Sequence, residues 1–94
     1  MKRQLVPEVL QAVAGDDYQV VAFFNDGSVH AFDVTPLLSG AVFAPLRDKE
    51  VFRRALTVMN HTVAWDLSGT RDATACIDID PVVVHRAPVF PSDI

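Results

Sequence analysis

The chain has 94 residues, of which 50% are hydrophobic, and carries a formal net charge of −4 at pH 7. A chain of this length forms one domain over residues 1–94, and its acidic balance excludes phosphate attraction as a general source of affinity, so we expect no direct binding of nucleic acid. The single cysteine, Cys76, excludes an internal disulfide and a cysteine-based zinc cluster, and it favours a reducing, cytoplasmic setting.

The first third of the chain is predicted to form three strands joined by turns. β-Branched and aromatic residues between turn signals predict strands over residues 8–14, 18–24 and 28–33. Before the third strand, Asp26-Gly27 predicts a two-residue type I′ loop, because such a loop needs a positive φ at both central residues and this dipeptide tolerates it.

That loop sets the register of the hairpin. On one face it pairs Phe24 with Val29, Ala22 with Ala31 and Val20 with Asp33. The other face then carries Val21, Phe23, His30 and Phe32. Since both faces are largely apolar, we expect a helix or the C-terminal segment to cover one of them, and a second layer or subunit to cover the other.

Two short helical pieces are predicted next. Thr35 is the expected cap of a single helical turn over residues 35–38, while Asp33 stands at a strand end where it too can cap this turn. Asp48 is the expected N-cap of a short helix that ends at residue 54 or 55.

The second half is predicted to add a hairpin and a last strand. Residues 56–59 and 62–65 form this hairpin around Asn60-His61, and a polar loop leads to a strand over 75–79. After Pro81, residues 82–85 fit either a helix or a strand, and residues 86–94 are expected to form a frayed tail. The predicted fold class is α+β: a small, mainly antiparallel sheet of hairpins with one or two short helices.

Four stretches occur in one order along the chain: FNDGSVHAFDVTPLL, FAPLRDKEVFRRA, TVAWDLSG and DIDPVVV. In this order they resemble the small bacterial proteins of the domain-of-unknown-function 2442 family. That family has a Phe before an Asp-Gly turn, an Asp before a Leu-rich turn, a Leu-Arg-Asp helix with an inward Phe, a Val-x-Trp strand and an Asp-Leu-x-Pro ending. The matching residues, within about 6–85, are Phe24, Asp26, Gly27, Asp33, Leu37, Leu38, Leu46, Arg47, Asp48, Phe52, Val63, Trp65, Asp78, Ile79 and Pro81.

The resemblance implies an α+β fold and no known activity. Some similar members carry an additional helix-turn-helix domain, and some occur beside another small protein in a toxin–antitoxin-like arrangement. We expect this chain to end too early to hold a DNA-binding domain. It departs from the commonest pattern in a longer loop after Trp65 and in Val82-Val83, where polar residues usually open a terminal helix.

Motifs for metal binding and covalent catalysis are incomplete. Four oxygen-bearing residues alternate as in a calcium loop: Asp66, Ser68, Thr70 and Asp72. Arg71 stands where that loop needs Gly, and Ile77 where it needs a bidentate Glu, so a hydrogen-bonded Asx loop is the preferred interpretation. The three histidines lack the helical spacing of a zinc site, and no serine lies in a Gly-x-Ser-x-Gly context. We expect no cofactor and no enzymatic activity.

Six residues form the candidate interaction or ligand surface: Arg47, Lys49, Arg53, Trp65, Asp66 and Asp78. The three basic residues belong to a positive patch that could dock an acidic partner, although a charged helix face is more often simply solvated. Trp65 is either a core anchor or an interface hot spot. Asp78 and Asp80 share a strand face, where turn formation is the stronger alternative to acid–base chemistry. Four residues of the family pattern are expected to have structural roles: Asp26, Gly27, Asp33 and Pro81.

These observations favour a non-enzymatic protein–protein interaction module. We expect a homodimer or a complex with another small protein, including a regulatory or antitoxin-like role, with an apolar sheet face as the contact. The alternative is a small-ligand-binding or enzymatic domain with a site near Trp65, Asp66 and Asp78. No apolar run is long enough to span a membrane or to form a signal-peptide core, so we expect a cytoplasmic protein without a membrane partner.

Overall fold

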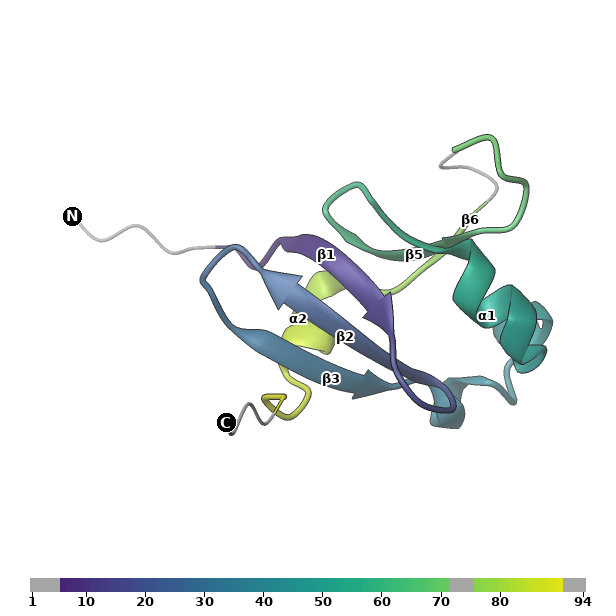
Figure 1. The fold of residues 1–94 in the computed structure, drawn as a ribbon, viewed down its shortest axis with the longest axis horizontal. Helices are drawn as coiled ribbons and strands as arrows, with labels where there is room; N and C mark the ends of the chain where they lie inside the picture. The colour runs from purple at the N-terminus through teal and green to yellow at the C-terminus, as the bar shows by residue number, and fades with distance from the viewer. Residues whose placement is uncertain (1–5, 72–75, 91–94) are drawn as a thin grey trace.

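The computed structural model describes residues 6–71 and 76–90, which form two three-stranded antiparallel sheets (Figure 1). The strands of the first sheet are β1 (Val9–Ala14), β2 (Gln19–Phe24) and β3 (Val29–Asp33), and those of the second are β4 (Leu56–Met59), β5 (Thr62–Asp66) and β6 (Cys76–Asp78). The helices in the same part of the chain are α1 (Lys49–Ala55), α2 (Pro81–His85) and the 3-10 helices η1 (Thr35–Leu37) and η2 (Ala41–Arg47). The predicted α+β class is confirmed, with the hairpins divided between two sheets.

The turn between β2 and β3 differs from the predicted two-residue loop. Phe24 N donates to the Ser28 carbonyl at 2.9 Å, so the loop contains three residues, Asn25, Asp26 and Gly27. Of these three, Gly27 alone has a positive φ, at 86°, whereas a type I′ loop needs one at Asp26 as well. The Asp26 carboxylate instead accepts from Ser28 N at 2.9 Å, which makes an Asx turn. The predicted register is therefore wrong by one residue.

This shift exchanges the two faces of β3, because successive side chains of a strand point to opposite sides. The predicted pairs of Phe24 with Val29, Ala22 with Ala31 and Val20 with Asp33 do not occur. The observed inner-face pairs are Val20 with Phe32 and Ala22 with His30, and the outer-face pairs are Val21 with Ala31 and Phe23 with Val29. The inner face belongs to the core, in which Val9, Val20, Ala22 and Phe24 are all buried.

The segment that fitted either a helix or a strand is the helix α2. Asp80 Oδ1 accepts from Val82 N at 2.9 Å, and Pro81 occupies the first turn, where its fixed φ is already helical. In Figure 1, α2 lies behind the first sheet, and its Val84 is fully buried. The C-terminal segment is thus the cover expected for one face of this sheet.

Residues 86–90 are not a frayed tail. Val89 forms an antiparallel bridge with His30. Ala31 N donates to the Pro88 carbonyl at 3.0 Å, and Phe90 N donates to the Val29 carbonyl at 2.8 Å. The tail therefore covers part of the β3 edge, which would otherwise offer its backbone groups to another strand. The fraying predicted for residues 91–94 lies outside the described residues.

The caps of the short helices follow the sequence with one exception. Asp48 Oδ1 accepts from Glu50 N at 2.9 Å, so Asp48 caps α1 as predicted. Thr35 was expected to cap the turn after β3, but it is the first residue inside η1. The N-cap residue is Val34, and Asp33 Oδ1, one residue earlier, accepts from Thr35 N at 2.9 Å and so satisfies the first backbone N–H of η1.

The hairpin predicted around Asn60-His61 is confirmed, and it carries the type I′ geometry that the Asp26-Gly27 turn lacks. The φ values of Asn60 and His61 are 52° and 65°. On β5, the fully buried Trp65 donates from Nε1 to the Phe52 carbonyl at 3.1 Å. This hydrogen bond joins the second sheet to α1.

Candidate interaction surface

The outer face of the first sheet keeps much of its apolar area exposed. Across the strands, Val13 lies opposite Val21, and Val21 lies opposite Ala31. The neighbouring row joins Phe23, Val29 and the tail residue Phe90, whose N–H binds Val29. Val13, Phe23 and Phe90 are 44%, 36% and 40% exposed. We define the outer face as Val13, Val21, Phe23, Val29, Ala31, Pro88 and Phe90.

An apolar hollow of about 410 Å³ lies at the turn end of the outer face. Its lining residues come from β2, the following turn, β3 and the tail: Phe23, Gly27, Ser28, Val29, Val89 and Phe90. The tail thus forms one wall of the hollow, and the position of residues 86–90 decides its shape.

A polar cluster ties this tail and α2 to the β2–β3 turn. His85 Nε2 lies 2.9 Å from Asp26 Oδ2, and Ser28 Oγ lies 2.5 Å from Asp26 Oδ1. His30 joins the cluster from β3: its Nε2 is 3.0 Å from Ser28 Oγ, and its Nδ1 is 2.8 Å from the Ala87 carbonyl oxygen. The His30 and His85 rings are 4.7 Å apart, and each meets the Phe24 ring edge to face. We call Asp26, Ser28, His30 and His85 the polar cluster.

Asp26 is the anion of the polar cluster. The hydrogen bonds from the Ser28 hydroxyl, the Ser28 backbone N–H and the His85 ring hold the pKa of its carboxyl well below the usual range, because each of them favours the charged form. Asp26 is therefore ionised at neutral pH and able to accept from both partners.

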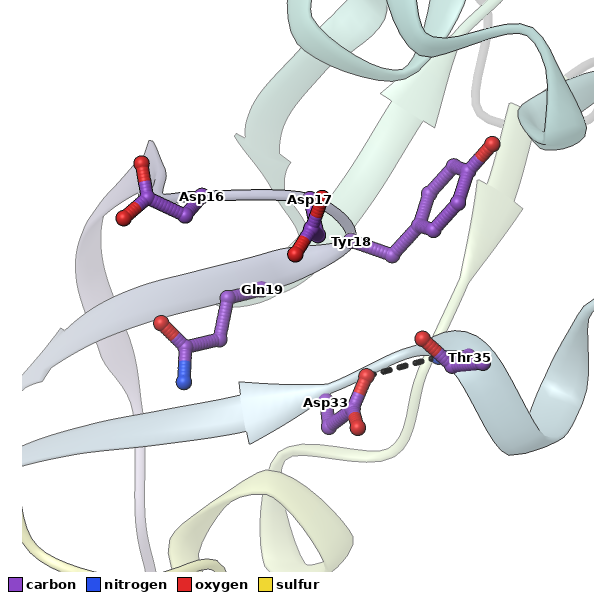
Figure 2. Close-up of a pocket in the computed structure, with 6 residues that line it drawn as sticks. All are labelled: Asp16, Asp17, Tyr18, Gln19, Asp33 and Thr35. Atoms are coloured by element: carbon purple, nitrogen blue, oxygen red, sulfur yellow. Dashed lines mark hydrogen bonds between the residues drawn. The ribbon is translucent and has the colours of Figure 1, made fainter.

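The opposite end of the outer face is acidic. A polar hollow of about 330 Å³ is lined there by Asp16, Asp17, Tyr18, Gln19, Asp33 and Thr35. Figure 2 shows Gln19 and Asp33 near the facing ends of β2 and β3, while the Tyr18 ring points away from them. Hydrogen bonds from the Thr35 backbone N–H and hydroxyl lower the pKa of Asp33, so its carboxylate stays charged. The outer face thus runs from an apolar end to an acidic end.

The basic residues of the predicted surface lie elsewhere, on η2 and α1. Arg47 Nε donates to the Leu38 carbonyl at 2.7 Å. Lys49 Nζ lies 3.1 Å from Asp17 Oδ1. Arg53 is exposed in the last turn of α1, where a cation stabilises the helix dipole. Arg47 and Lys49 thus make contacts within the chain, and all three lie outside the outer face.

The other three predicted surface residues do not form one site. Trp65 is fully buried, so its side chain makes no surface contact. On β5 and β6, Trp65 pairs with Ile77, whereas Asp78 is exposed and pairs with Ala64 on the opposite face. The structure therefore separates Trp65 from Asp78.

Asp66 is satisfied by its own loop. Its carboxylate accepts from Arg71 N at 2.7 Å, Gly69 N at 3.0 Å and Ser68 Oγ at 3.0 Å. Desolvation raises the pKa of Asp66, but these hydrogen bonds outweigh it and bring the pKa below its usual value. This is the Asx loop that the sequence favours over a calcium loop, although Asp72 lies outside the described residues.

Sequence reasoning missed the polar cluster and the tail contact. His30 and Ala87 are 57 positions apart, and Asp26 and His85 are 59 apart, so no local spacing joins them. The sequence contains a partial signal. His30 stands among apolar residues in a predicted strand, and a polar side chain that is buried there needs hydrogen-bond partners within the protein.

Residues 6–71 and 76–90 contain no helix that is both long and apolar enough to cross a membrane. No group of three or more His, Cys, Asp or Glu side chains in that part of the chain could hold a metal ion.

Comparison with known proteins gives one match. The model of a family described as a protein of unknown function (DUF2442) matches residues 9–84, which confirms the resemblance noted in the sequence. No curated protein and no solved structure matches the chain.

Proposed function

The chain belongs to the DUF2442 family, whose members share no described activity, and from this premise we propose that it is a non-enzymatic protein–protein interaction module. The outer face of the first sheet is the contact surface, and a second copy of the chain is the first partner to consider. The observation that carries this proposal is the exposure of Phe23 and Phe90 beside the half-buried Val29.

The continuity of the outer face supports a protein contact. Its residues form two adjacent rows across three strands and the tail, so the apolar surface is continuous. Continuous apolar patches on monomers reach about 300–600 Å² and are often functional. The two phenylalanine rings at one end belong to a residue type that is enriched at the cores of protein interfaces.

Self-association is compatible with the charges of the outer face. Its acidic residues, Asp16, Asp17 and Asp33, lie at one end, whereas Phe23 and Phe90 lie at the other. In a face-to-face pair whose two-fold axis runs across the strands, the acidic end of each copy is kept away from the acidic end of its partner. Pairing with another small protein, in the regulatory or antitoxin-like manner that the family resemblance implies, would use the same surface.

Light scattering after size exclusion tests the proposal with two matched variants. Phe23→Glu places a charge in the outer face, and Val42→Glu places the same charge at an exposed apolar residue of η2. We expect a dimer for the wild type and for Val42→Glu, and a monomer for Phe23→Glu. A wild-type monomer at high micromolar concentration, with no partner recovered by pull-down, contradicts the proposal.

A small-ligand-binding function is the second candidate, and the apolar hollow favours it. Its volume of about 410 Å³ is within the ~300–1,000 Å³ typical of ligand pockets. A ligand that binds only the native state raises the melting temperature, so a thermal-shift screen of apolar metabolites tests this candidate. A hit that Phe23→Glu abolishes supports it, and a screen without hits counts against it.

A further inference from the structure

Every charged residue of the first sheet and its turns is acidic. Between positions 4 and 46 the charged residues are Glu8, Asp16, Asp17, Asp26 and Asp33, with no Lys or Arg among them. At the acidic end of the outer face, Asp17 lies 3.1 Å from Lys49, whereas neither Asp16 nor Asp33 has an ion pair within residues 6–71 and 76–90. Because like charges across an interface cost free energy, a partner that covers this end has to bring positive charge.

Two basic residues, Lys2 and Arg3, precede the first sheet and lie outside the described residues. We call them the basic segment. The described chain begins at the opposite end of the outer face, beside the β2–β3 turn. There Asn25 Nδ2 donates to the Val6 carbonyl at 3.2 Å, and Glu8 N donates to Asn25 Oδ1 at 3.1 Å. The basic segment is therefore attached at the apolar end.

The basic segment cannot reach the acidic end of its own copy. Asn25 N donates to the Glu8 carbonyl, and Gly15 N donates to the Gln19 carbonyl, so β1 and its flanks run the full length of β2. From Gln19 to Asn25 the strand rises about 20 Å, at ~3.3 Å per residue. Residues 2–6 extend at most about 14 Å even when fully stretched. The positive charge for the acidic end has to come from another molecule.

A face-to-face pair with its two-fold axis across the strands supplies that charge. On β1, Gln11 stands midway in the sequence between Val6 and Asp16, and it lies opposite Phe23 on β2. With the axis over this row, Val6 of one copy lies over the turn that holds Asp16 in the other, because the axis reverses the strand direction. The same axis places both Phe23 rings at the centre of the contact, where apolar side chains are buried most completely.

We infer that a second copy of the chain docks on the outer face in this arrangement, and that the basic segment of each copy binds beside the acidic end of its partner. An axis along the strands would instead set the two acidic ends against each other. The inference rests on the proposed function, because it requires association through the outer face. It adds the orientation of the pair and the residues that fix this orientation.

Charge reversal tests the arrangement in the complete chain, with light scattering over a range of concentrations. Lys2→Glu combined with Arg3→Glu gives the basic segment the sign of the acidic end, so we expect the dimer dissociation constant to rise about tenfold. Gln19→Lys adds a positive charge beside Asp33, its cross-strand partner, and should raise the constant several-fold. Arg53→Glu combined with Arg54→Glu is the matched control. It makes the same change of charge in the exposed last turn of α1 and should leave the constant within about twofold of the wild-type value.

Mixing the two kinds of variant gives a sharper readout. In a mixed pair, the reversed segment of the first variant faces the added charge of Gln19→Lys, and the unchanged basic segment of the second faces an unchanged acidic end. Both contacts are then attractive, whereas each variant alone pairs like charges. With one variant labelled with ¹⁵N, we expect native mass spectrometry to show mixed dimers well above the half that random pairing gives.

Two results overturn the inference: a Lys2→Glu, Arg3→Glu variant that dimerises as tightly as the wild type, or a mixture that shows only random pairing. If Phe23→Glu still dissociates the wild-type dimer, the proposed function stands, so its failure and that of the inference are distinguishable. A wild type that stays monomeric at high micromolar concentration contradicts the inference, whichever partner a pull-down recovers.

Discussion

His85 on α2 lies 2.9 Å from Asp26 in the turn between β2 and β3, although 59 positions separate them in the chain. The contact fixes the last helix to the first sheet at the point where the tail begins. It therefore connects the packing of the core to the shape of the apolar hollow on the opposite face.

Replacing His85 tests the strength of this connection. His85→Ala removes the hydrogen bond to Asp26 and the ring contact with Phe24. Because the side chains of His85 and Asp26 are about one third exposed, we expect the free energy of unfolding to fall by about 1 kcal/mol. Urea denaturation measures it. His61→Asn is the control, since the 3.9 Å contact of His61 with Glu8 is exposed and contributes little, and Asn tolerates the φ of 65° at this position. An equal loss in both variants contradicts the importance of the His85–Asp26 contact.

Acid should destabilise the protein through Asp26. Its folded-state pKa lies below the unfolded value, so its contribution to stability is present above about pH 4 and is lost as the pH falls through the folded-state pKa. We expect Asp26→Asn to flatten the decline in melting temperature between pH 4 and pH 2. Thermal unfolding followed by circular dichroism measures this slope. Asp16→Asn, at an exposed turn position, should leave it unchanged.

Gly27 supplies a backbone conformation that other residues adopt at a cost. Its φ of 86° is left-handed, and an added Cβ there meets no atom within 4 Å. Gly27→Ala should therefore lower the free energy of unfolding through backbone strain alone, by about 1–2 kcal/mol. Gly40→Ala is the matched control in urea denaturation, because Gly40 has a φ of −77°. Equal stability of the Gly27→Ala variant and the wild type would contradict the three-residue loop.

Trp65 anchors α1 to the second sheet. Trp65→Phe removes the donor to the buried Phe52 carbonyl and leaves a small cavity. We expect a loss of about 2–3 kcal/mol, because both the unpaired carbonyl and the cavity destabilise the core. Chemical denaturation followed by far-ultraviolet circular dichroism measures it, and a loss under 0.5 kcal/mol would show that Trp65 is not a core anchor.

Calcium should not stabilise the loop that follows β5. The Asp66 carboxylate already accepts three hydrogen bonds from its own loop, and a cation would have to displace them. Adding millimolar CaCl₂ is expected to leave the melting temperature unchanged within error. A concentration-dependent rise that Asp66→Ala removes would restore the metal interpretation.

The sequence predicts the local features of this fold well, because each depends on a few adjacent residues. Asp48 caps α1, and Asn60-His61 forms the second hairpin turn, as their residue types indicate. The prediction of a two-residue loop at Asp26-Gly27 was wrong for a specific reason. The Asp26 carboxylate accepts from Ser28 N, and this Asx turn favours a three-residue loop that the Asp-Gly dipeptide alone does not reveal. Because the loop is one residue longer than predicted, the β3 side chains lie on the faces opposite to those predicted.

The features that define the candidate surface depend on distant contacts. In residues 82–85, the run of valines favours a strand, but the Asp80 cap and Pro81 start a helix. The pairing of Val89 with His30 has no local signal, so the tail was expected to fray. The apolar character of the sheet was visible in the sequence, but which side chains remain exposed follows only from the register and from the position of α2.

The accessibility of the Phe23 ring in the assembled protein shows whether the outer face is the contact surface. A soluble paramagnetic agent broadens the signals of exposed side chains, so broadening can be compared between dilute and concentrated samples. We expect Phe23 and Phe90 to become shielded as the concentration rises, while Val42 on η2 stays accessible. Equal broadening of Phe23 at every concentration, or shielding of Val42 instead, would show that the outer face is not the contact surface.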